Sequence, residues 1–78
     1  MKYKAAMNEN DLVVLAKTLR KKAGKTRAQA AREMGVMQTS IFNAEETPGQ
    51  SLVKLRVRMI EAYSAFKVRG PVYLLEEK

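Results

Sequence analysis

The chain contains no cysteine, no histidine and no tryptophan. It therefore cannot form a disulfide, a thiol nucleophile or a usual zinc site, and it lacks the commonest general base. Its acids, Glu33, Glu45, Glu46 and Glu61 among them, show no arrangement that suggests a catalytic pair. We expect no enzymatic activity, no cofactor and no metal.

Long apolar runs are also missing. The longest near the N-terminus, residues 12–16, is far shorter than the roughly 20 residues that cross a bilayer. We expect no signal peptide, and the lack of disulfides favours a cytoplasmic location. Apolar residues make up 46% of the 78-residue chain. This predicts one folded domain, residues 1–78, with one small core.

Acidic residues are absent from residues 12–32, where there are seven basic ones, and the whole chain carries a net charge of +7. A block of one sign repels itself unless a polyanion binds it. Double-stranded DNA is the partner that we favour. The alternatives are a solvated cationic face, an acidic protein or an anionic membrane, for which the first helix has few aromatic anchors.

Apolar spacing predicts a first helix that is capped by Asn8 or Asn10 and ends at Gly24. The positions that share its inward face are Leu12, Leu15, Ala16, Leu19 and Ala23. Residues 1–7 alternate weakly, which fits either a short strand or an arm.

Residues 26–46 predict two short helices that cross through a tight turn. Thr26 and Gln29 fit a capping box at the start of the first of them. Gly35 can take the left-handed conformation that ends it. The next helix begins near Met37 or Gln38, of which Met37 is a poor N-cap, and Ile41 faces the core.

The C-terminal part, residues 51–78, predicts a helix capped by Ser51 and then a short strand at residues 72–75. Apolar residues recur along this helix, at Leu52, Leu55, Met59, Ala62 and Phe66. Further apolar residues, Val53, Val57, Ile60 and Tyr63, widen the stripe, which suggests a partner. A lone strand is unstable, so we expect it to pair with residues 1–7 or with the same strand of a second subunit.

Residues 12–63 resemble the lambda-repressor-like helix-turn-helix domain of the Cro/phage-repressor (xenobiotic-response-element regulator) family. The residues that carry the resemblance are Leu19, Arg20, Thr26, Ala31, Gly35, Val36, Ile41 and Glu45. The resemblance implies a mainly α fold of four to five helices, here with a short C-terminal strand.

The resemblance also implies that outward residues of the third helix contact DNA bases. These are Met37, Gln38, Thr39, Phe42 and Asn43. Amides can pair with adenine, and apolar side chains can contact the thymine methyl group. The alternatives are that the polar residues are simply solvated and that Phe42 folds back on the core.

Phosphate contacts would fix the register of the protein on DNA. The candidates are Lys25, Thr26, Arg27, Arg32 and Lys54. The first three lie at a helix N-terminus, which favours anions. We expect Arg20, Lys21 and Lys22 to add only to the electrostatic field.

Together these features predict a sequence-specific DNA-binding transcriptional regulator, a repressor-like homodimer. The residues expected at the dimer surface are Tyr63, Phe66, Val72, Tyr73, Leu74 and Leu75. The alternative is a protein-interaction adaptor, such as an antitoxin or immunity partner, whose C-terminal strand extends the sheet of another protein.

Overall fold

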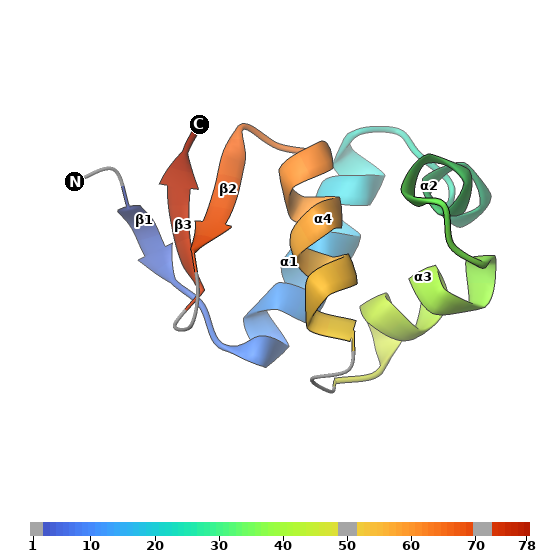
Figure 1. Cartoon of the computed structure of the whole chain (residues 1–78), viewed down its shortest axis with the longest axis horizontal. Coiled ribbons are helices and arrows are strands. Elements are labelled where there is room, and N and C mark those ends of the chain that lie inside the picture. The colour runs from blue at the N-terminus through green and yellow to red at the C-terminus, as the bar shows by residue number, and fades with distance from the viewer. Residues whose placement is uncertain (1–2, 49–51, 70–72) are drawn as a thin grey trace.

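The computed structural model describes residues 3–48, 52–69 and 73–78, and within them lie four helices and a three-stranded sheet. In chain order the elements are β1 (Tyr3–Ala6), α1 (Glu9–Lys22), α2 (Arg27–Met34), α3 (Gln38–Glu46), α4 (Val53–Ala62), β2 (Phe66–Arg69) and β3 (Leu74–Glu77). Helices α1 and α4 pack together in the middle, between α2 and α3 on one side and the sheet on the other (Figure 1). The predicted mainly helical class is confirmed.

The helix ends follow the predicted local chemistry. The Asn8 side chain accepts a hydrogen bond from the Asp11 N–H at 2.8 Å, and Asp11 accepts one from the Asn8 N–H at 3.0 Å. Thr26 and Gln29 form the same reciprocal pair at 3.0 and 2.8 Å. Gly35 ends α2 in the left-handed conformation, with φ 71°. In each capping box, side chains accept hydrogen bonds from backbone N–H groups that would otherwise be unpaired at the start of the helix.

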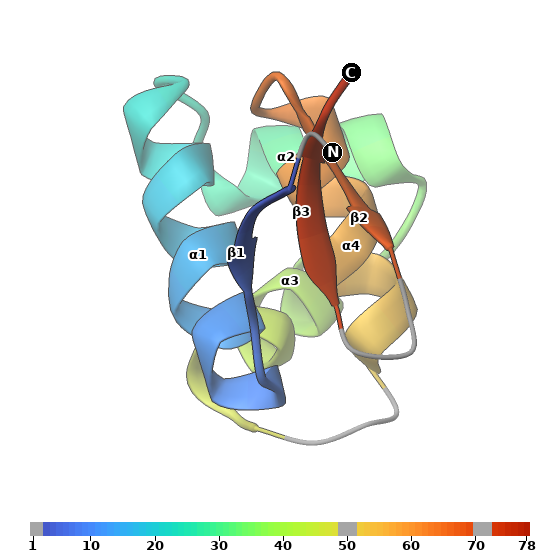
Figure 2. The same cartoon turned by 90° about the vertical axis from the view of Figure 1, so that its left-hand side faces the viewer.

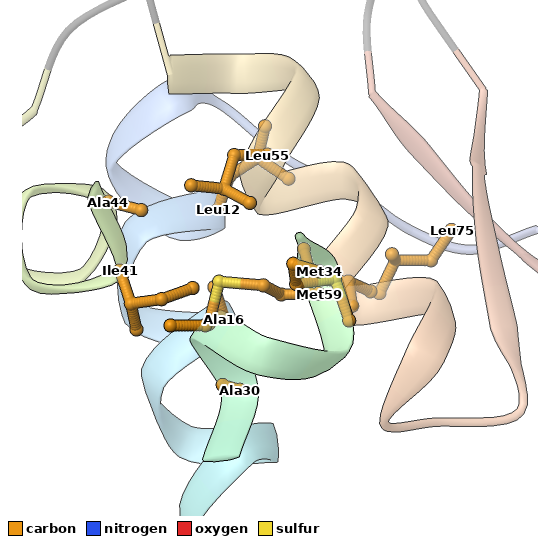
Figure 3. Close-up of a cluster of buried hydrophobic side chains, with 11 residues drawn as sticks. Leu12, Ala16, Ala30, Met34, Ile41, Ala44, Leu55, Met59 and Leu75 are labelled. Carbon is orange, nitrogen blue, oxygen red and sulfur yellow. The ribbon is translucent and has the colours of Figure 1, made fainter. Parts of the chain in front are cut away.

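The core lies where the four helices meet. Leu12, Ile41, Met59 and Ile60 are fully buried. Figure 3 shows Ile41 of α3 pointing toward Ala16 and Met59. The small side chain of Ala31, one of the residues that carry the family resemblance, is also buried. This packing determines which face of α3 points inward and which remains outside.

The sheet has the order β1-β3-β2, with β3 antiparallel to both neighbours (Figure 2). Residues 1–7 therefore supply one of the two predicted strand partners, as β1, and β2 is a second partner that we did not predict. The predicted strand 72–75 is shifted: β3 begins at Leu74 and includes Glu76. The backbone of Tyr73 explains the later start, because its φ of 51° lies in the left-handed region and ends the extended conformation before Leu74. Within the sheet, Arg69 Nε of β2 lies 2.9 Å from Glu76 Oε1 of β3. Val72 lies outside the described residues.

The prediction that the fourth helix extends to Phe66 is wrong, because α4 ends at Ala62 and Phe66 begins β2. Ser64 supports the change of direction. Its hydroxyl donates to the Ile60 carbonyl at 2.6 Å and accepts a hydrogen bond from the Phe66 N–H at 3.1 Å. Such local side-chain bonds compete with helix formation. The predicted cap, Ser51, lies outside the described residues.

The wide apolar stripe of α4 is covered within the chain. Ile60 is fully buried, Leu75 of β3 is buried, and Phe66 and Val68 of β2 pack against the core. The sheet thus provides the apolar cover that one small helical core would lack. The width of the stripe at Ile60 is therefore explained without a partner protein, while Val53, Val57 and Tyr63 are half-buried.

We predict that Gly35→Ala lowers the free energy of unfolding by about 1 kcal/mol, the cost of a left-handed conformation for a residue with a Cβ. A Cβ would meet no atom within 4 Å at Gly35, and the same holds at Gly24, where φ is 74°. Backbone strain is therefore the whole expected cost. Urea unfolding measures it, and Gly35→Asn should lose less. Equal stability of Gly35→Ala and the parent chain would contradict this account.

Candidate nucleic-acid interface

Helix α3 presents one face to the core and another to solvent. Ile41, Ala44 and Glu45 are buried. Of the predicted base-contact residues, Met37 is 73% exposed and Phe42 is 46% exposed. Gln38 and Thr39 are also exposed, and Asn43 is half-buried. The two faces follow from the 3.6-residue period of the helix.

The start of α3 carries no side-chain cap. Met37 is the N-cap residue and makes no side-chain hydrogen bond to the first turn, as expected for methionine. Its carbonyl accepts the Ser40 N–H at 2.9 Å. The backbone N–H groups of Gln38 and Thr39, which come before Ser40, lie at the positive end of the helix dipole. A phosphate oxygen is favoured at this position.

The first residue of α2 and the outward face of α3 border an open hollow of about 410 Å³. It is lined by Arg27 of α2 and by Gln38, Thr39 and Phe42 of α3. A predicted phosphate-contact residue and three predicted base-contact residues thus lie together. Met37 and Asn43 are not among the lining residues.

Arg27 is held on three sides. Its guanidinium carbon lies 4.8 Å from the centre of the Phe42 ring, a cation–π contact. Its Nε donates to Glu45 Oε1 at 3.0 Å, and a terminal nitrogen donates to Glu46 Oε2 at 2.6 Å. The alternative that Phe42 folds back on the core is wrong, because its ring remains at the surface under Arg27.

Glu45 is also bound by Arg20, and this pair was not predicted. The Arg20 Nε and a terminal nitrogen donate to the two Glu45 oxygens at 2.5 and 3.0 Å. Arg20 is only 6% exposed, so the expectation that it adds only to the surface field is wrong. The sequence contains a signal for the pair, since Arg20 follows Ala16 by four residues and Glu45 follows Ile41 by four.

Arg56 of α4 is fully buried and binds the other end of α3. Its guanidinium donates to the Ala44 carbonyl at 2.8 Å and to the Thr47 carbonyl at 2.5 Å. Burial lowers the pKa of Arg56 below its ordinary value. The carbonyls at a helix C-terminus carry partial negative charge, so this contact replaces water as their partner.

The predicted phosphate-contact residues differ in their partners. Lys25 lies 2.7 Å from Glu33, and this hydrogen bond lowers the pKa of the Glu33 carboxyl. Such surface pairs are weak, so a phosphate could replace the carboxylate. The Thr26 hydroxyl serves the α2 cap. Within the described parts of the chain, Arg32 and Lys54 are exposed and have no ion-pair partner.

The predicted dimer residues mostly pack within the chain. Leu75 is buried, and Phe66, Tyr73 and Leu74 are half-buried. The Tyr63 hydroxyl donates to Glu33 at 2.6 Å, and burial, with this bond, raises its pKa to about 12. These are the residues that attach the sheet and α4 to the helical core.

The free edges of the sheet are unequal. Strand β3 pairs on both sides. On the outer side of β2, the Val68 N–H donates to Glu61 Oε2 at 3.0 Å and the Phe66 N–H donates to the Ser64 hydroxyl. Side chains thus occupy donors that another strand would need. Among the described strands, this leaves the outer edge of β1 for an added strand.

The chain matches no protein-family model, no curated protein and no solved structure. Across the three described stretches, no helix is long and apolar enough to cross a membrane. The same stretches contain no cluster of three or more His, Cys, Asp or Glu side chains that could hold a metal ion.

We predict that Glu45→Gln lowers the free energy of unfolding by about 3 kcal/mol, because it leaves the buried Arg20 without a charged partner. Glu46→Gln is the matched control. That carboxyl is exposed, and its hydrogen bond with Lys17, 2.7 Å long, lowers its pKa. The control should change stability little. Equal losses in the two variants, measured by urea unfolding, would contradict a special role for the buried carboxylate.

Proposed function

We propose that the protein is a sequence-specific double-stranded DNA-binding regulator with a lambda-repressor-like helix-turn-helix domain. The observation that carries the proposal is the exposed N-terminal half of α3, which follows α2 across the Gly35 turn and borders one hollow together with Arg27 from the start of α2. An α-helix held in this way can enter the major groove while the neighbouring helix contacts the backbone.

The chemistry of α3 suits base readout. Gln38 is exposed and Asn43 is half-buried, and either amide can form two hydrogen bonds to adenine N6 and N7. The exposed hydroxyl of Thr39 can bond a base or a phosphate. No acid occurs in residues 37–43, so this part of the helix does not repel DNA.

The electrostatic attraction comes from outside α3. Among the described cations, Lys21, Lys22, Arg32 and Lys54 are exposed and have neither an ion-pair partner nor a side-chain hydrogen bond, whereas the exposed Arg58 and Lys78 donate to backbone carbonyls. The first four lie on α1, α2 and α4. Lysine and arginine that neutralise phosphates release counterions and supply most non-specific affinity. In the proposed complex, α3 therefore contacts the bases, and the cations of the other helices attract the phosphate backbone of the DNA.

We propose further that two copies bind one operator as a repressor-like dimer. One domain of this size reads few base pairs, and a two-fold pair of copies doubles the site. Since β3 is paired on both sides and β2 is capped, the β1 edge is the place where a second copy could add a strand. The adaptor alternative relied on a free C-terminal strand, and no observation favours it.

The test is selection of retained sequences from a random DNA pool at about physiological salt, with the oligomeric state followed by sedimentation. We expect an enriched inverted repeat whose half-site spacing reports the dimer geometry. Salt-sensitive binding without any enriched sequence would overturn sequence-specific recognition. Absence of DNA binding would overturn the whole proposal.

Two substitutions separate base readout from backbone attraction. Gln38→Ala should cost about 1–3 kcal/mol on the selected site and relax one position of the motif. Lys54→Ala should weaken binding equally on all sequences and reduce the salt slope by about 1. Both side chains are exposed, so folding should be unaffected. Fluorescence anisotropy over a salt series measures both quantities, and a sequence-independent loss in Gln38→Ala would count against base readout by α3.

A further inference from the structure

An aromatic ring stands at the surface in the middle of the proposed reading helix. Phe42 is 46% exposed, although apolar surface is normally removed from water. It is not part of a large exposed apolar patch, because the hollow that it lines is completed by Arg27, Gln38 and Thr39. A small site lined by one aromatic ring and three polar side chains differs from the extended apolar patches of protein–protein docking surfaces.

The ring is held in place from the core outward. The buried Glu45 carboxylate binds Arg20 on one side and the Nε of Arg27 on the other. Arg27 in turn lies over the Phe42 ring, with its guanidinium carbon 4.8 Å from the ring centre. Phe42 therefore presents an oriented apolar surface without being buried.

The charge around the hollow argues against an anion as its occupant. Arg27 is the cation that lines it, and this guanidinium already binds the carboxylates of Glu45 and Glu46 at 3.0 and 2.6 Å. A ligand that fits must offer an apolar group to Phe42 and a hydrogen-bonding edge to Gln38 and Thr39. In the major groove, a pyrimidine with a 5-methyl group offers both within one base.

We propose that this hollow reads the 5-methyl group of a pyrimidine in the major groove, with Phe42 contacting the methyl group and Arg27 positioning the ring. The proposal rests on the proposed function and deepens it. It makes Phe42 a specificity-determining residue, and it assigns Arg27 to hold Phe42 rather than to bind phosphate.

The test is a pair of parallel selections, from one random pool made with thymine and one made with uracil, which lacks only the methyl group. We expect a motif from the thymine pool that loses at least one thymine position in the uracil pool. Single uracil substitutions at that position of the operator should weaken binding about three- to fivefold per half-site, the value of one buried methyl group.

Substitutions at residues that line the hollow test whether it causes the difference in affinity between thymine and uracil. Phe42→Ala should bring the thymine-to-uracil affinity ratio to about one, and Arg27→Lys should reduce the ratio although lysine keeps the positive charge. Val14→Ala is the matched control, since Val14 is 65% exposed on α1, and it should leave the ratio unchanged. Circular dichroism checks that each variant is folded.

The outcomes separate this proposal from the proposed function. The same motif in both pools, with cytosine 5-methylation also without effect, would overturn the methyl reader and leave DNA binding intact. If methylating a cytosine of the operator raises affinity and Phe42→Ala removes the gain, 5-methylcytosine is the source of the methyl group. No motif in either pool would overturn both proposals.

Discussion

The buried carboxylate of Glu45 is the group on which the arrangement of the first three helices depends. It lies on α3 and accepts hydrogen bonds from Arg20 of α1 and Arg27 of α2. Removing a charge from water is costly, and a buried ion pair often adds little net stability. Its effect is instead geometric, because either arginine would be left unpaired in another arrangement of the helices. The interaction therefore favours one relative placement of α1, α2 and α3.

The C-terminal half of α3 is anchored much more firmly than its N-terminal half. Arg56 of α4 binds the carbonyls of Ala44 and Thr47, while Glu45 binds α1 and α2. All of these contacts lie beyond Ile41 along the helix. The first turn, by contrast, starts at an uncapped Met37 and is largely exposed. A helix fixed at one end can present the other end rigidly to a large ligand, which is the geometry that preorganised recognition requires.

Local signals predicted the helical part of the fold, and tertiary contacts decided the rest. The capping box at Thr26 and the left-handed Gly35 could be predicted because their chemistry lies within a few residues. Strand β2 could not, since its sequence FKVR continues the apolar spacing of α4 and Ser64 alone marks the break. Outward positions of α3 followed from periodicity. The role of Arg27 did not, because it depends on residues 15 to 19 positions away along the chain.

The described basic residues of the chain fall into two groups, those that stabilise the fold and those that remain exposed. Arg20 and Arg56 are buried, and Arg27 is neutralised by Glu45 and Glu46, so these arginines serve the fold. The described cations that remain exposed without an ion-pair partner all lie outside α3. A helix of little charge can approach the base edges, where hydrogen bonds and apolar contacts distinguish one base from another. Such a helix is not held by phosphates, which are the same in every DNA sequence. Separating attraction from readout in this way allows weak electrostatic association to precede specific recognition.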